Sequence, residues 1–379
     1  MKNFKALFYL PQNDIYMASH STGCLPKKTK LAIEQFLFDW SHHGVEAWEQ
    51  WLLELDKFNQ SLATLFNADA REFCFQTNVS SALSKIIQAL PKRLGRKKII
   101  ISEMDFLTVR FIAEQAKKLG YEIVILKSTD EQFTLSSWKE ALTEQVQMAI
   151  ITHVIPKNNF KNPVEEIIAV ARQYDIISVV DIAQSAGIVP IDFKKMNADV
   201  IISNCLKWLC SGPGTAFLWV NQNFLDLFNP LDVGWFSNEA PFDFNSLEFH
   251  YASNSRRFLG GTPAILACLA ARHSVDNINQ IGMDTIHLHN QQHVDHILSF
   301  ILKYKLNLKS PSDKNIRGGT VCLKFTDTLK AYQFLKQNHI ITDSVKTVHE
   351  NAYIRISPHI YNSVDEIEQV LNCLNKMRE

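Results

Sequence analysis

The chain has 379 residues, of which 46% are hydrophobic and 21% charged, and it carries no net formal charge at neutral pH. This composition can fill one or two large cores, and the balanced charge argues against a nucleic-acid partner or an anionic membrane surface. No apolar run approaches the roughly 20 residues of a membrane-spanning helix, so we expect no membrane association. Seven cysteines occur without a C-x-x-C pair, which is typical of a reduced, cytoplasmic protein.

In chain order, the first elements are predicted helices over 30–40 and 45–66, where apolar residues recur at helical spacing. A short apolar segment, 71–76, then precedes polar residues at 77–81, a pattern typical of a strand, a loop and a helix start. From there to residue 220, strand and helix patterns alternate. The expected strands are 98–102, 122–126, 148–153, 176–180, 200–203 and 214–220, and the expected helices are 108–119, 136–144 and 164–174. Such alternation predicts a largely parallel sheet flanked by helices, with ligands bound at the C-terminal ends of strands.

A domain boundary is expected near residue 260. Thr262-Pro263 signals a helix start, and the helical pattern then runs through residue 301. A strand at 320–325, a helix at 328–337, a strand at 353–357 and a helix at 364–375 complete a small α+β unit. We therefore predict an α/β protein in three parts. These are an N-terminal segment, 1–25, packed on the small domain, a large α/β domain, 26–260, and a long connecting helix with the small C-terminal domain, 261–379.

Two charged residues follow neighbouring strand patterns. Asp181 ends one strand, and Lys207 lies just past the next, ahead of Gly212-Pro213-Gly214. Alone the pair carries little information, because most aspartates at such positions cap helices and most lysines lie on the surface. A lysine and a carboxylate are nevertheless what pyridoxal 5′-phosphate (PLP) chemistry requires. The lysine forms an imine with the cofactor, and the carboxylate keeps its pyridine nitrogen protonated.

The sequence around these residues resembles the aminotransferase class V group of fold-type I PLP enzymes. Residues 181–187 read D-I-A-Q-S-A-G, and residues 207–214 read K-W-L-C-S-G-P-G. The layout is similar to that of kynureninases across nearly the whole chain. The matching segments are 15–23, 44–48, 77–80, 103–108, 234–236, 257–263 and 354–362. This resemblance implies a fold-type I enzyme that binds PLP and acts on an amino acid as a transaminase, a hydrolase or a lyase.

The resemblance also implies roles for individual residues. Lys207 forms the Schiff base and moves the proton at the substrate Cα, while Asp181 pairs with the ring nitrogen. The implied phosphate contacts are Asn78, Val79, Ser80, Asn204 and, from a neighbouring subunit, Thr262. The implied ring contacts are Phe106 and Gln184, and Trp235 is a further implied cofactor contact. The implied substrate contacts are Arg355, which binds the α-carboxylate, Trp48 and Ser21. The role of Thr262 further implies a homodimer.

Several residues depart from the kynureninase pattern. Leu206 stands where kynureninases have a Tyr, Val109 where they have an Asp, and Ala18-Ser19-His20 where they have Asp-Gly-Asn. These departures leave open a non-catalytic PLP-fold protein that binds a ligand or a partner. A cysteine desulfurase is disfavoured, since no Cys lies between Ile340 and Arg355.

Three histidines could be mistaken for a metal site. His289, His293 and His296 share one helical face without the accompanying carboxylate geometry of a metal site. A metal site normally needs further ligands in a closed geometry. We therefore interpret the three histidines as residues of a solvated or subunit-facing surface and predict no metal.

Overall fold

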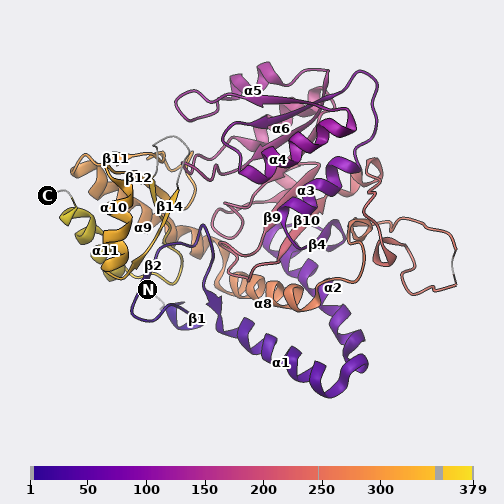
Figure 1. Cartoon of the computed structure of the whole chain (residues 1–379), viewed down its shortest axis with the longest axis horizontal. Coiled ribbons are helices and arrows are strands. Elements are labelled where there is room, and N and C mark those ends of the chain that lie inside the picture. Colours follow the sequence, from indigo (N-terminus) through magenta and orange to yellow (C-terminus); the bar gives the residue numbers. More distant parts are fainter. Residues whose placement is uncertain (1–3, 246, 346–352, 378–379) are drawn as a thin grey trace.

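The structure is a computed structural model that describes residues 4–245, 247–345 and 353–377. A seven-stranded sheet forms its centre (Figure 1), in which β10 runs antiparallel to both neighbours and the other adjacent pairs are parallel. In sheet order the strands are β4 (Phe73–Gln76), β10 (Ala216–Val220), β9 (Val200–Asn204), β8 (Ile177–Asp181), β7 (Val146–Thr152), β5 (Lys98–Ser102) and β6 (Glu122–Leu126). The mainly parallel α/β sheet predicted from the strand–helix alternation is thus confirmed.

Helices cover both faces of this sheet, because alternate residues of each strand face opposite sides. Val179 packs in the core with α3 and α4, whereas Val180 packs in the core with α2, α6 and α8. Two buried faces require the near-continuous Ile and Val runs seen in the sequence. The helices of this region are α2 (Trp48–Phe66), α3 (Val79–Gln88), α4 (Leu107–Ala116), α5 (Leu135–Ala141), α6 (Val164–Gln173), α7 (Phe193–Met196) and α8 (Ile265–Ile281).

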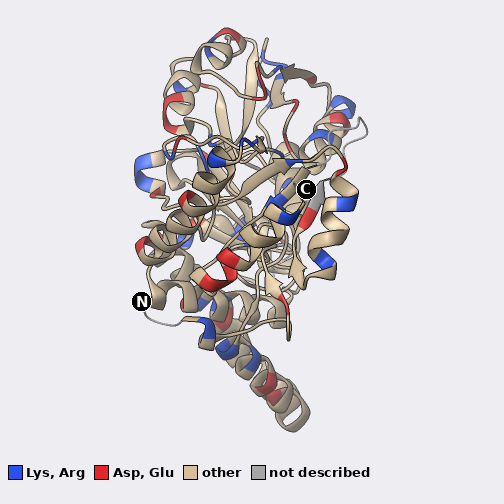
Figure 2. Cartoon of the chain, turned by 90° about the vertical axis from the view of Figure 1, so that its left-hand side faces the viewer, with Lys and Arg blue, Asp and Glu red and all other residues tan. Residues whose placement is uncertain are grey.

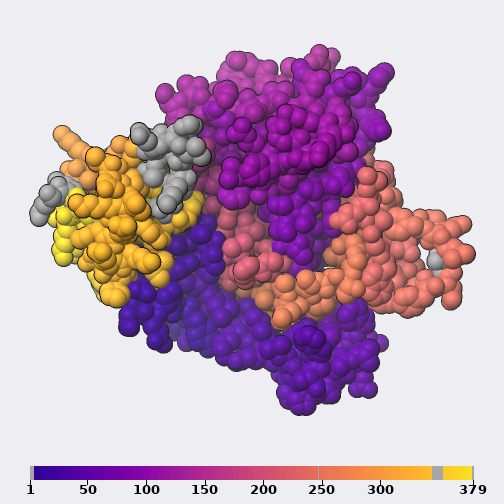
Figure 3. Space-filling view, in the orientation of Figure 1, coloured from indigo at the N-terminus to yellow at the C-terminus, as the bar shows by residue number. Residues whose placement is uncertain are grey.

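A smaller unit lies beside the large one, coloured orange and yellow in Figure 3. Its four-stranded sheet has the order β11 (Asn307–Leu308), β12 (Val321–Lys324), β15 (Tyr353–Ile356) and β14 (Asp343–Val345). The helices of this unit are α9 (Met283–Lys303), α10 (Thr328–Gln337) and α11 (Val364–Lys376). The N-terminal strand β2 (Ile15–Tyr16) pairs in parallel with β13 (Ile340–Ile341), and Met17 is buried in the same core. The N-terminal segment therefore contacts the small unit.

The remaining N-terminal elements form an arm. Strand β1 (Phe8–Tyr9) pairs with β3 (Leu25–Pro26), and α1 (Lys27–His43) and η2 (Gly44–Ala47) then lead into α2. Figure 2 shows α1 projecting from the body, with acidic and basic residues intermingled over the visible face. The other 3-10 helices are η1 (Phe4–Leu7), η3 (Ala70–Glu72), η4 (Lys117–Leu119), η5 (Gln222–Leu227), η6 (Trp235–Ser237) and η7 (Ser255–Phe258). In the described ranges, no helix is both long and apolar enough to span a bilayer.

Two expectations about the C-terminal part are wrong. The single helix predicted from 262 to 301 is two helices, α8 and α9, separated at Gly282, whose φ of +92° favours glycine. The histidine face is not solvated throughout: His293 is only 3% exposed, and it packs against Asn362, whose carbonyl lies 3.2 Å from its Nε2. The boundaries of the three predicted parts stay predictions. Positions 1–3 of the first part and 346–352 and 378–379 of the third lie outside the described residues.

Candidate active site

Most of the predicted site residues gather in one cavity of about 280 Å³ at the C-terminal edge of the large sheet. The register explains this, because the parallel strands β8 and β9 bring their C-terminal ends to the same edge, with Val180 opposite Ile201. The predicted residues that line the cavity are Asn78, Val79, Ser80, Phe106, Asp181, Gln184, Asn204 and Lys207. Residues 77–80, 106, 181–184 and 204–207, far apart in sequence, are thus brought together.

Asp181 and Lys207 have perturbed acidities in this cavity. Asp181 is 6% exposed and accepts a hydrogen bond from the Ala183 N–H at 2.8 Å. Burial raises its pKa, and the Ala183 N–H and the charge of Lys207 oppose that rise. Burial lowers the pKa of Lys207 to about 8, although Asp181 acts in the opposite direction. A carboxylate in this environment needs a cation close to it, and a lysine with this pKa is available as a nucleophile.

The start of α3 provides a site for an anion. Asn78 is the N-cap, and its side-chain oxygen accepts from the Ser81 N–H at 2.7 Å. The first N–H groups of the helix, at Val79 and Ser80, have no partner within the helix and point toward its N-terminal end. Across the cavity, the buried Oδ1 of Asn204 has no hydrogen-bond partner among the described residues. The free N–H groups of Val79 and Ser80 fit a phosphate, whose oxygens accept hydrogen bonds. The Asn204 oxygen is itself an acceptor and would need a donor.

Phe106 lies at the mouth of the cavity, on the loop between β5 and α4. Its side chain is 55% exposed, and its ring centroid is 5.7 Å from the Lys207 Nζ. The neighbouring Asp105 is buried, and it accepts hydrogen bonds from the Ser102 N–H and hydroxyl at 2.7 and 2.8 Å and from the Thr152 hydroxyl at 2.7 Å. Burial raises the pKa of Asp105 to about 6. These contacts fix the loop that carries Phe106.

The N-terminal segment closes against the Lys207 loop. The Gly23 N–H donates to the Leu206 carbonyl at 2.8 Å, and a Cβ at position 23 would lie 2.2 Å from the Lys207 carbonyl oxygen. Glycine is therefore required there. Gln184 connects the same parts, because its amide donates to the His20 carbonyl at 3.3 Å.

Arg355 lies outside the residues that line the cavity but contacts its wall. Its Nη1 donates to the carbonyl of Pro156, a lining residue, at 3.1 Å. Its Nη2 forms an ion pair with Asp343, a residue that sequence reasoning missed. A substrate carboxylate at Arg355 would thus reach the cavity from the side of the small unit.

The sequence and fold of the chain are similar to those of known proteins. The sequence model described as Aminotransferase class-V matches residues 15–370. The chain belongs to this family. As a class-V family member it is a PLP-dependent enzyme, and the Asp181 carboxylate, the Lys207 amine and the N-terminus of α3 fit that cofactor.

The class-V enzyme is similar to relatives that differ in name. It is 25% identical to an uncharacterized aminotransferase, YcbU, of Bacillus subtilis over 98% of this chain and 96% of that one. It is 26% identical to the kynureninase of Deinococcus radiodurans, over 84% of this chain and 79% of the relative.

Solved structures share its fold. The cysteine desulfurase of Thermococcus onnurineus has a TM-score of 0.87 at 21% identity, covering 100% of this chain and 98% of the other. A C-DES mutant with glycine covalently linked to its PLP cofactor has a TM-score of 0.88 at 19% identity, covering 98% of each chain. At these sequence identities, the structural similarity shows only that the chain has the fold-type I architecture.

Besides Arg355, four predicted residues of the class-V enzyme do not line the cavity. Trp48 and Trp235 stack on each other, with ring centroids 6.5 Å apart and planes 2° from parallel. Ser21 and Thr262 are exposed. No motif of this chain predicted that the two tryptophans meet. Their roles stay predictions.

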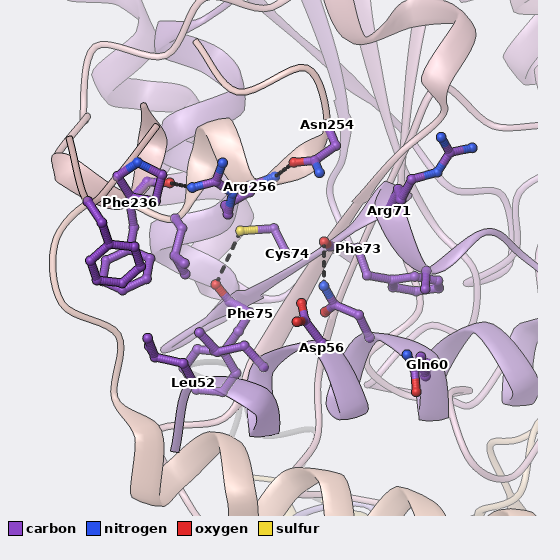
Figure 4. A pocket seen from close by; sticks show the side chains of 16 residues that line it. Leu52, Asp56, Gln60, Arg71, Phe73, Cys74, Phe75, Phe236, Asn254 and Arg256 are labelled. Carbon is purple, nitrogen blue, oxygen red and sulfur yellow. Dashed lines mark hydrogen bonds between the residues drawn. The ribbon is translucent and has the colours of Figure 1, made fainter. Parts of the chain in front are cut away.

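A larger cavity, of about 440 Å³, lies between α2, β4 and the segment 236–259 (Figure 4). None of the predicted site residues lines it. The Arg256 guanidinium that faces it is already bonded to the Phe236 and Glu239 carbonyls, both at 3.0 Å. The smaller cavity is therefore the candidate active site. Among the described residues, no group of three or more His, Cys, Asp or Glu side chains could hold a metal ion.

Proposed function

We propose that this class-V enzyme acts on an amino acid, with Lys207 holding PLP through its amine and Asp181 facing the pyridine nitrogen. One observation carries the proposal: both groups line a single cavity that the N-terminus of α3 also lines. This arrangement combines an anion site, a carboxylate and a lysine whose pKa burial lowers to about 8. A helix cap and a surface lysine would not share such a cavity.

The residues at the cavity would have the following roles. When bound, PLP supplies an aldehyde that condenses with amines and a ring that accepts electrons from the substrate Cα. Lys207, once neutral, accepts the proton from that Cα. Asp181 holds a proton on the ring nitrogen by its charge. Arg355 binds the α-carboxylate, because a planar guanidinium offers two parallel N–H donors.

The remaining cofactor contacts are proposed from the lining of the cavity. The N–H groups of Val79 and Ser80, with the side chains of Asn78 and Asn204, would hold the phosphate. Phe106 would cover one face of the ring, and Gln184 would bind the ring oxygen. In addition, Trp48 and Ser21 are proposed to contact the substrate.

The reaction type is proposed only as kynureninase-like transaminase, hydrolase or lyase chemistry. Leu206 lines the cavity and has no proton to donate where kynureninases have a Tyr. A proton for the substrate side chain would therefore come from another group. Cysteine desulfurase chemistry stays disfavoured, because the sequence between Ile340 and Arg355 has no nucleophilic Cys.

The test is the visible absorbance of protein purified with PLP. Wild-type protein should be coloured, and borohydride, which reduces the imine to a stable amine, should leave its cofactor covalently attached after denaturation and dialysis. Lys207→Ala should fold and retain no cofactor after the same treatment. Lys161→Ala is the matched control, since burial also lowers the pKa of Lys161, which lies outside this cavity. A Lys207→Ala protein whose cofactor stays covalently attached after borohydride reduction and denaturation would overturn the assignment. Screening amino acids for a shift of the absorbance identifies the substrate.

We further propose a homodimer in which Thr262 completes the phosphate site of the partner subunit. The exposed position of Thr262, away from its own cavity, supports this arrangement. Thr262→Ala should weaken PLP binding and leave the dimer intact. Light scattering that finds a monomer with full PLP occupancy would contradict the proposal.

A cytoplasmic location is also proposed. All seven cysteines are free and buried, as expected of a chain that folds in a reducing compartment. Fractionation of cells that express the tagged protein tests this location. Recovery from the extracellular medium would contradict it.

A further inference from the structure

The guanidinium of Arg355 already has an anionic partner inside the protein. Arg355 on β15 and Asp343 on β14 are directly opposite each other in the antiparallel register, and their side chains form an ion pair through Nη2. Nη1 is bonded to the Pro156 carbonyl, and the buried Nε has no partner among the described residues. One donor of Arg355 is thus unused, and another is occupied by a carboxylate.

Asp343 is held in place by a second residue. Its Oδ2 lies 3.3 Å from the Nε2 of His20, whose Nδ1 is 2.6 Å from the Ser357 hydroxyl. His20 is 1% exposed, and this burial lowers its pKa to about 4, so the ring is neutral at physiological pH. The hydrogen bond from His20 and the charge of Arg355 hold the pKa of Asp343 well below its usual range. Asp343 is therefore charged at physiological pH.

The charges of this cluster consequently cancel. Arg355 contributes one positive charge, Asp343 one negative charge, and His20 none. The other ionisable groups that influence the cluster include Lys207, Tyr16, Tyr353 and Cys322. Tyr16, Tyr353 and Cys322 are neutral, because burial raises the pKa of each. A substrate carboxylate that approached Arg355 would meet a fixed carboxylate on the same guanidinium. Two like charges at one site repel each other, and such contacts are a common way to exclude ligands.

We propose that Asp343 is a specificity-determining residue that competes with the substrate carboxylate for Arg355. The proposal rests on the function proposed above, in which Arg355 binds that carboxylate. Binding is then an exchange: the substrate displaces Asp343 from Nη2 and engages the unused Nε. Small amino acids bind weakly under this arrangement. A substrate that binds well gains further contacts from the apolar cavity wall, which includes Val154, Pro156 and Leu206.

The experiment replaces the charge and keeps the shape. Asp343→Asn retains an oxygen that accepts from His20 and Arg355. Three probes are titrated into wild-type and variant holoenzyme by calorimetry: propionate, L-alanine and L-alaninamide, which lacks the carboxylate. Propionate and L-alanine should bind about tenfold more tightly to the variant, and L-alaninamide should bind equally to both. The matched control is Asp14→Asn, which removes a carboxylate from an exposed pair with His339, 3.0 Å away, and should leave all three affinities unchanged.

Two results overturn the proposal. Equal affinity of propionate for wild type and variant would show that Asp343 does not compete. Weaker binding to the variant would show that Asp343 only orients Arg355. Asp343→Ser repeats the test if the Asn variant does not fold. If wild-type protein failed to take up PLP, its absorbance would contradict the proposed function. Propionate binding would still report whether Asp343 competes for Arg355.

Discussion

Replacing Asp181 by Asn separates cofactor binding from turnover. Asp181 is 6% exposed and is fixed by the Ala183 N–H at 2.8 Å. The amide of Asn is nearly the same shape and can keep that hydrogen bond, so the end of β8 should fold as before. It carries no negative charge and cannot hold a proton on the ring nitrogen of PLP. The variant should therefore bind PLP and lose most of its activity.

The expected size of the effect follows from the burial of Asp181. A buried, pre-oriented charge acts without reorganisation, and the loss of one such contact costs about 3 kcal/mol in the transition state, a rate decrease of roughly 100-fold. The assay is kcat with the amino acid found by the absorbance screen, measured beside PLP occupancy.

The matched control is Asp199→Asn. Asp199 is also buried, and it accepts hydrogen bonds from the Ser178 N–H and hydroxyl at 2.7 and 2.9 Å, but it lies outside the cavity. This variant should lose stability and keep kcat per bound PLP. If Asp181→Asn turned over at near the wild-type rate, Asp181 would be a structural cap, and the proposed placement of the ring would be wrong.

Three further predictions concern the same cavity. Arg355→Lys should raise KM about tenfold or more with little change in kcat or in the cofactor absorbance, because a lysine cannot bind a carboxylate through two parallel N–H groups. Steady-state kinetics test this prediction, and a fall in kcat alone would contradict it. The rate at which apoenzyme takes up PLP should rise with pH and level off above a pH of about 8. Protonated Lys207 is unreactive, and burial lowers the pKa of Lys207 to about 8. A rate that continues to rise toward pH 10 would refute this prediction. Asp105→Ala should lower the free energy of unfolding by about 3 kcal/mol, since three buried donors of Ser102 and Thr152 lose their acceptor; an unchanged urea midpoint would disprove it.

The sequence by itself determined the large sheet. Strand positions such as 98–102 and 122–126 were predicted at their observed bounds, because a strand buried on both faces must be apolar at nearly every position. The place of Asp181 in the cavity also followed, since it ends β8, where the topology of a parallel sheet brings strand ends together. Asn78 and Lys207 were expected at the site from the family resemblance.

The tertiary structure alone decided the surroundings of Arg355. Asp343 follows a two-residue strand and carries no local signal, and it meets Arg355 only because β14 and β15 pair in one particular register. His20 joins them from the other end of the chain. The division at Gly282 was likewise hidden, because apolar spacing continues through it. Periodicity reports which face of an element is buried, whereas the partner of a buried charge depends on how distant segments dock.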